Sequence, residues 1–168
     1  MKTNGKKYNH HVSVPSGKGL RVDKSVTINL PAPEVYSFWR RLENLPHFMR
    51  HVEAVREDDP WHSHWRVKTA ANTHLEWDAE IIEDEKDRMI SWRSIPGADV
   101  ENAGSVWFTP SRDGSSTRVK VSLKYLPPGG KFGAAAAEFF GAGAKSEIEE
   151  DLAELKTWLE HGAEVPQS

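Results

Sequence analysis

Six side chains near the middle of this chain have types and spacing that could support chemistry. Three are histidines, which are frequent zinc ligands: His62, His64 and His74. Three are carboxylates at alternate positions, which could bind a metal or exchange protons with a substrate: Glu76, Asp78 and Glu80. A zinc site needs three or four converging ligands, so the elements that carry these residues decide whether they can act together.

Alternation of apolar and polar residues predicts two neighbouring strands, Trp61–Lys68 and His74–Glu83, and these strands carry the three histidines and the three carboxylates. Successive side chains of a strand point to opposite faces, so the polar residues of each strand share one face and the apolar residues the other. The polar face of the first strand also carries Arg66 and Lys68, which would repel a cation. We therefore interpret the histidines and carboxylates as a solvated face with cross-strand charge pairs, and we expect no metal site.

The composition excludes several classes of protein. The formal net charge of the 168 residues is −3, which gives no overall field for nucleic acid, and we expect no nucleic-acid partner. The absence of cysteine excludes disulfides, thiol catalysis and cysteine–zinc sites. No 18 apolar residues run together, and the N-terminus lacks the apolar core of a signal peptide. We expect a cytoplasmic protein with at most transient membrane contact and no cofactor.

One α+β domain is expected over residues 19–162, because the chain has the length of a single domain. Residues 1–18 are polar and are predicted to form a flexible tail, and residues 163–168 a short C-terminal tail. A period of two predicts seven strands: Leu20–Leu30, Val52–Glu57, Trp61–Lys68, His74–Glu83, Arg88–Arg93, Gly104–Thr109 and Ser116–Leu126. The last six have short connections, so consecutive strands among them can pair only antiparallel.

Helical spacing occurs on both sides of these strands. Pro33 suits the first position of a helix after the first strand, and a short helical turn is predicted at Leu45–Met49. Near the C-terminus, four apolar residues at helical spacing predict a long amphipathic helix: Ile148, Leu152, Leu155 and Leu159. The stretch 133–144 is rich in Ala and Gly, and two interpretations stay open: the mouth of a cavity, or a helix packed tightly on the sheet.

The apolar face of the predicted sheet is strongly aromatic. A twisted sheet wrapped around one helix leaves a gap that two layers cannot fill, which predicts a hydrophobic cavity with few ionisable groups. Its predicted ligand-binding residues are Trp65, Trp77, Trp92, Phe108, Tyr125, Phe132 and Phe139. The segments Asn44–Met49 and Phe132–Gly143 are the candidate gates. Plain core packing is the alternative for these side chains.

Seven short motifs carry a resemblance over about residues 20–162. They are Val35–Trp39, Leu42–Met49, Glu76–Ile81, Ile90–Ser94, Gly104–Phe108, Tyr125–Gly130 and Asp151–Lys156. They resemble the bacterial polyketide cyclase/dehydrase and lipid-transport branch of the START/Bet v 1-like (SRPBCC) superfamily, which is similar to coenzyme Q-binding proteins. The resemblance implies a helix-grip fold, in which a curved seven-stranded antiparallel sheet wraps around a long C-terminal helix and two short helices follow the first strand. It also implies a hydrophobic ligand, because members bind sterols, lipids, quinones, aromatic polyketides and plant hormones, although fold alone transfers no activity.

Three functions stay open. We expect a carrier or binding protein, monomeric or homodimeric, for a hydrophobic small molecule of the lipid, quinone or aromatic polyketide type. The first alternative is a polyketide aromatase/cyclase or dehydrase without metal or cofactor. The second is a partner-binding or chaperone-like module, for which an exposed patch of Phe139 and Phe140 would be the sign.

Catalysis would need a general acid or base within reach of the substrate in a dry cavity. The candidate polar groups are Ser63, Asn72, Arg93, Asn102 and Tyr125. Tyr125 is the best placed, on the apolar face of the last strand, whereas Arg93 reaches that face only if its strand bulges or ends there. No His, Asp or Glu falls on the inner face of the predicted sheet, so binding is favoured over catalysis.

Overall fold

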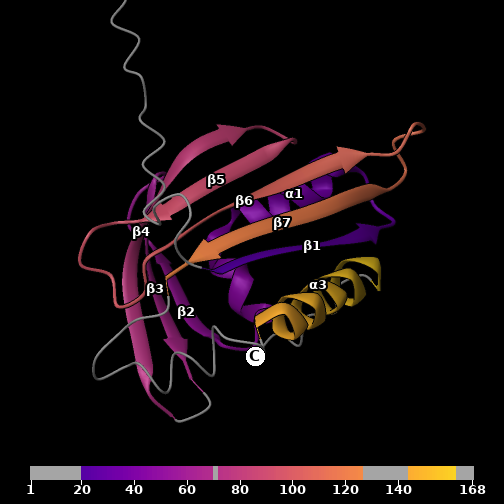
Figure 1. Ribbon diagram of the computed structural model, residues 1–168. Coiled ribbons are helices and arrows are strands. Elements are labelled where there is room, and N and C mark those ends of the chain that lie inside the picture. The colour runs from indigo at the N-terminus through magenta and orange to yellow at the C-terminus, as the bar shows by residue number, and fades with distance from the viewer. Residues whose placement is uncertain (1–19, 70–71, 127–143, 162–168) are drawn as a thin grey trace, which may run out of the picture.

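A computed structural model describes residues 20–69, 72–126 and 144–161, and the element labels follow Figure 1. Seven strands form one antiparallel sheet in the order β1-β7-β6-β5-β4-β3-β2. The strands are β1 (Leu20–Ile28), β2 (Val52–Glu57), β3 (His62–Lys68), β4 (His74–Glu85), β5 (Met89–Ser94), β6 (Asn102–Pro110) and β7 (Thr117–Tyr125). All seven predicted strands are confirmed. The two predicted tails, the Ala- and Gly-rich stretch, Phe132, Phe139 and Phe140 lie outside the described residues.

Among the residues that the structure describes, three helical segments pack on the inner side of the sheet. They are α1 (Ala32–Arg40), the 3-10 helix η1 (Leu42–His47) and α3 (Ala144–Glu160). Pro31 caps α1 with an extended backbone, and Pro33 lies in the first turn, where a missing N–H costs nothing. Figure 1 shows α1 behind β6 and β7, and α3 alongside β1, with which it makes contact. The fold is the predicted helix grip.

The main hydrophobic core lies between α1, η1, α3 and the inner side of the sheet. Trp39 of α1 lies at its centre, with ring centroids 5.5 Å from Phe48 and 6.2 Å from Phe108. Leu155 of α3 is fully buried in the same cluster. Aromatic pairs in such edge or tilted arrangements add to the free energy of burial. This core holds the three helices against the sheet.

A β-bulge in β4 changes which face its last residues occupy. The register with β5 shifts between Ile81 and Glu83, so Ile82 is an extra residue. Without the bulge, Asp84 would share the outer face with Glu80. With it, Asp84 turns inward and joins the inner side of the sheet to α1.

Asp84 accepts two hydrogen bonds from α1. The Tyr36 hydroxyl donates to Oδ1 at 2.5 Å, and Arg40 Nε donates to Oδ2 at 2.8 Å. Burial, together with the nearby Asp84 carboxylate, raises the pKa of Tyr36 to about 12. The Asp84 side chain is only 14% exposed, so this contact is a partly buried ionic link between α1 and β4.

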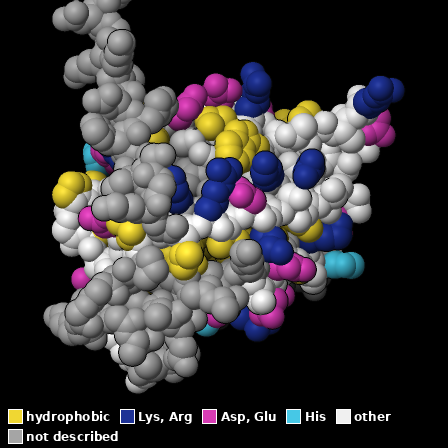
Figure 2. Space-filling view, in the orientation of Figure 1, with side chains coloured by type: hydrophobic (Ala, Val, Ile, Leu, Met, Phe, Trp, Pro, Cys, Tyr) yellow, Lys and Arg dark blue, Asp and Glu magenta, His cyan; other side chains and the backbone are white. Residues whose placement is uncertain are grey.

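The outer face of the sheet is polar at β3 and β4, as predicted. His64 lies opposite Asp78 in the β3–β4 register, and its two ring nitrogens lie 2.9 Å from Asp78 Oδ1 and 3.2 Å from Glu76 Oε1. These carboxylates raise the pKa of His64. Figure 2 shows Lys and Arg side chains along the part of this face formed by β1 and β7, whose outward basic residues are Arg21, Arg118, Lys120 and Lys124.

Two possible features of such a chain are absent from the part of it that the structure describes. No group of three His, Asp or Glu side chains is arranged to hold a metal ion. No helix is long and apolar enough to cross a membrane.

Candidate functional site

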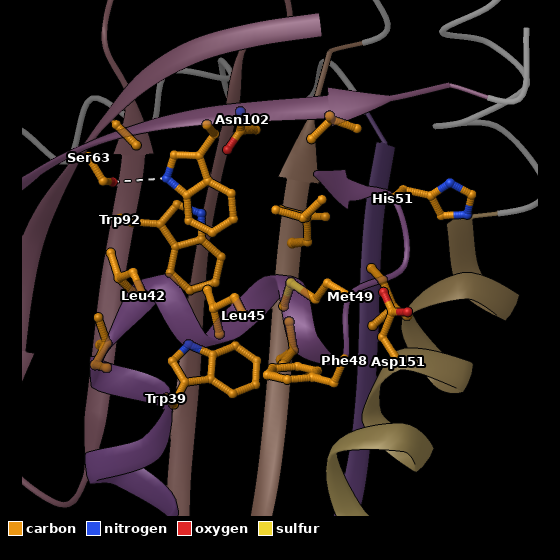
Figure 3. A pocket seen from close by; sticks show the side chains of 18 of the residues that line it. Trp39, Leu42, Leu45, Phe48, Met49, His51, Ser63, Trp92, Asn102 and Asp151 are labelled. Atoms are coloured by element: carbon orange, nitrogen blue, oxygen red, sulfur yellow. Dashed lines mark hydrogen bonds between the residues drawn. The ribbon is translucent and has the colours of Figure 1, made fainter. Parts of the chain in front are cut away.

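A largely apolar, partly open cavity of about 150 Å³ lies between the sheet and the helical segments (Figure 3). From α1, η1 and the following residues its wall takes Trp39, Leu42, Leu45, Phe48 and Met49, and from α3 it takes Ile148 and Leu152. From the sheet it takes Trp65, Val67, Trp77, Ala79, Ile81, Ile90, Trp92, Val121 and Leu123. An apolar cavity of roughly 150 Å³ in another protein holds benzene, so this volume suits about one aromatic ring.

Small residues at the middle of the sheet leave this space open. Ser63 and Ala79 face each other across β3 and β4. On one side of them Trp65 and Trp77 stack, with ring centroids 6.1 Å apart and planes 9° from parallel. Trp65 Nε1 donates to Ser63 Oγ at 2.9 Å, which fixes the ring and satisfies the buried hydroxyl.

Gly104 determines where the Trp92 indole can lie. The two residues are register partners across β5 and β6. A Cβ at position 104 would lie 2.5 Å from Trp92 Cζ2 and 2.8 Å from the Ser122 carbonyl oxygen. The indole therefore lies directly over the Gly104 backbone, which brings Trp92 into the cavity wall without blocking the cavity.

Three ionisable side chains line the end of the cavity beside α3, which corrects the prediction of a cavity nearly free of such groups. His51 precedes β2, and Glu147 and Asp151 lie one turn apart on α3. His51 Nε2 lies 2.8 Å from Glu147 Oε1. The Arg50 backbone N–H donates to Asp151 Oδ1 at 3.5 Å. Figure 3 shows His51 and Asp151 together on the α3 side of the cavity.

The surroundings of these carboxyls disfavour their charged forms. Burial raises the pKa of Asp151 to about 6, with a further contribution from Glu147, while Arg50 and His51 act in the opposite direction. Burial also raises the pKa of Glu147, against the effect of His51. Both carboxyls are thus partly desolvated groups in a mostly apolar wall.

We expect Asp151→Asn to stabilise the protein above pH 7. An acid whose pKa is raised from 3.8 to about 6 on folding loses stability as the pH rises through that window. The full shift corresponds to roughly 3 kcal/mol, and partial exposure of the side chain reduces this to about 1 kcal/mol. Thermal unfolding should show a Tm for Asp151→Asn that is higher by about 2–4 °C at pH 8, with no gain at pH 4.

The groups that face Asp151 are Glu147, His51 and Arg50, so the comparison needs a control for net charge. Glu150→Gln removes the same charge from the same turn, at a side chain that is 60% exposed. It should change stability by less than about 0.5 kcal/mol at either pH. A lower Tm for Asp151→Asn at pH 8 would show that its carboxylate is stabilised by its neighbours.

The structure separates the residues that the sequence grouped together. Trp65, Trp77 and Trp92 line the cavity, as do Ser63 and Asn102. Phe108 packs against Tyr36 and Trp39 in the core, and Tyr125 is 1% exposed in a second core cluster, where burial raises its pKa. The cavity-lining residues include neither of these two side chains.

Two other polar candidates lie away from the cavity. Arg93 Nε donates to Glu80 Oε1 at 2.5 Å on the outer face, and the β5–β6 register is regular at Arg93. Asn72 is exposed in a turn, with a positive φ of 63°. A ligand-binding or catalytic role for any of these residues stays a prediction.

Residues 28–153 match the family model described as "Polyketide cyclase / dehydrase and lipid transport". An uncharacterized 17.2 kDa protein of Streptomyces lincolnensis, from the melC2-rnhH intergenic region, is 31% identical over 107 residues, which are 64% of this chain and 69% of the relative.

Solved structures agree with this match. DR_A0006 of Deinococcus radiodurans superposes with a TM-score of 0.68 at 34% identity, covering 85% of this chain and 98% of that one. The Zhui aromatase/cyclase of Streptomyces sp. R1128 has a TM-score of 0.63 at 17% identity, covering 90% and 99% of the two chains, and shows the shared fold alone. The chain therefore belongs to the polyketide cyclase/dehydrase and lipid-transport family.

Proposed function

We propose that this protein is a carrier or binding protein that holds a compact hydrophobic molecule in the cavity between the sheet and α3. The observation that supports the proposal is the cavity itself, which is largely apolar and has the stacked indoles of Trp65 and Trp77 in its wall. An apolar space of this kind loses dispersion contacts unless it is filled, so a ligand of matching size gains free energy from both burial and packing.

Filling the cavity from the protein side should abolish this binding. Ala79 is 2% exposed and faces the cavity, so Ala79→Leu places three additional carbons in the space of the ligand. We expect the affinity for toluene, a probe of one ring, to fall by at least about tenfold, which corresponds to 1.4 kcal/mol. NMR titration of the tryptophan indole N–H signals measures this affinity, because Trp39, Trp65, Trp77 and Trp92 line the cavity.

Ala153→Leu is the matched control, because Ala153 is exposed on α3. It should leave toluene binding unchanged, and circular dichroism should show that both variants keep the wild-type fold. If the wild-type protein does not bind toluene, or if Ala79→Leu binds it as well as the wild type does, the cavity is not the binding site.

Extraction of the purified protein followed by mass spectrometry identifies the class of natural ligand. A hydrophobic compound recovered from the wild-type protein and lost from Ala79→Leu would support the proposal. A compound recovered equally from both would place its binding elsewhere.

A second function, that of an aromatase/cyclase or dehydrase, is favoured by one observation. His51 and Glu147 are in contact, and Asp151, with a pKa of about 6, lines the same end of the cavity. A carboxyl with a pKa near the working pH can donate or accept a proton. Recovery of the bound compound in a changed form after incubation would support this function, and recovery unchanged would support the carrier.

A further inference from the structure

The charges at the α3 end of the cavity are unbalanced. Glu147 has His51 as its partner at 2.8 Å. The Arg50 guanidinium lies 3.7 Å from Glu150, where both side chains are largely exposed. Within the described part of the chain, Asp151 takes part in no ion pair, and its hydrogen bond from the Arg50 backbone is long, at 3.5 Å. The Asp151 carboxylate therefore lines the apolar space with little compensation from the residues that the structure describes.

Such a group distinguishes between polar ends of a ligand. A carboxylate accepts several hydrogen bonds, so a hydroxyl or an ammonium group beside it would add a stronger donor to the long hydrogen bond from the Arg50 backbone. A ligand carboxylate or phosphate at the same place would add a second negative charge in a partly desolvated site, which is unfavourable. The raised pKa of Asp151 is consistent with this, because it reports that the negative charge is poorly accommodated in the ligand-free protein.

The position of Asp151 relates this preference to the apolar cavity. Asp151 and Leu152 are consecutive on α3 and both line the space, so an apolar body beside Leu152 would bring its polar end to Asp151. The volume of about 150 Å³ accommodates a buried body of about one ring.

We propose that the cavity selects ligands with an apolar body of about one ring and a polar end that donates hydrogen bonds to Asp151. The cavity rejects ligands with an anionic end. This inference rests on the proposed binding function. The donating end is a hydroxyl or an ammonium group. Acidic lipids and aromatic acids are thereby excluded as ligands of this site.

Four probes of similar size test the proposal: toluene, benzyl alcohol, benzylamine and phenylacetate. Their affinities for the full-length protein at pH 7.5 are measured by the same NMR titration. We expect benzyl alcohol and benzylamine to bind about tenfold more tightly than toluene, because hydrogen bonds to charged groups are strong, and phenylacetate to bind more weakly than toluene. If benzylamine binds more tightly than benzyl alcohol, the preferred ligand has an ammonium end. If benzyl alcohol binds more tightly, the preferred ligand has a hydroxyl end.

Asp151→Asn and Glu150→Gln remove the same charge on α3, but only the first changes the cavity wall. In Asp151→Asn the advantage of benzylamine over toluene should disappear and phenylacetate should gain about tenfold, while toluene is unaffected. Glu150→Gln should keep the wild-type order. If phenylacetate binds to the wild type as tightly as benzyl alcohol does, or if Asp151→Asn keeps the wild-type order, the inference is wrong while the binding function stands. If toluene fails to bind, both are wrong.

Discussion

Asp84→Ala is expected to lower the free energy of unfolding by about 3 kcal/mol, because it removes the acceptor shared by two partly buried donors. Arg40 and Tyr36 both donate to this carboxylate, and the Arg40 side chain is only 20% exposed. Arg40 keeps a hydrogen bond to the Pro60 carbonyl oxygen, which limits the loss. Thermal unfolding should show a Tm lower by roughly 6–12 °C.

Asp58→Ala is the control for an ordinary surface pair. Asp58 accepts from Arg56 at 2.7 Å, but the two side chains are 44% and 69% exposed. Exposed pairs contribute little, so this variant should lose less than about 0.5 kcal/mol. Equal losses in Asp84→Ala and Asp58→Ala would mean that the contact between α1 and β4 is no stronger than a solvated pair.

Leu155→Ala is expected to cost a similar amount, about 3 kcal/mol, for a different reason. Leu155 is fully buried in the main core, and truncation of a buried leucine loses transfer free energy and leaves a void. The loss should also loosen α3, which carries Leu152 and Asp151 in the cavity wall. Urea unfolding monitored by circular dichroism gives the change in free energy, and toluene titration gives the effect on the cavity.

Leu20→Ala provides the comparison, because Leu20 is 44% exposed at the start of β1. It should lose less than about 1 kcal/mol and bind toluene as the wild type does. A Leu155→Ala variant with wild-type stability would indicate that the sheet holds together without the contact with α3.

The strands of this protein could be predicted because apolar and polar residues alternate with a period of two in the sequence of each strand. The same period placed Trp65 and Trp77 on the inner face, and the structure agrees. It did not predict the bulge in β4, because the insertion of one residue leaves only a local trace, the adjacent apolar pair Ile81 and Ile82. The inward turn of Asp84 was missed for this reason.

Alternation gives the face of a residue but not its distance from a cavity. Phe108 and Tyr125 share the inner face with Trp92, yet both lie in the core rather than in the cavity wall. Their positions depend on how seven strands are shifted relative to one another, and no local pattern encodes that arrangement.

The ionisable end of the cavity was missed for two further reasons. The apolar spacing of α3 identifies only the stripe itself, whereas Glu147 and Asp151 precede Ile148 and Leu152 by one position each and lie at the edge of that stripe. His51 lies in a connection, where no periodicity applies. The polar residues beside the apolar stripe are the sequence signal that points to the two carboxyls.

The pairing of β1 with β7 has a consequence for synthesis on the ribosome. Leu20 is the register partner of Tyr125. The ribosome must therefore add on the order of 100 residues after β1 before β7, the strand that pairs with it, has been synthesised. At typical elongation rates this delay is about 5–20 s. During that time β1 has an unpaired edge and an apolar side without a core, which favours association with other chains. The nascent protein is therefore most in need of chaperones before its last strand has been made.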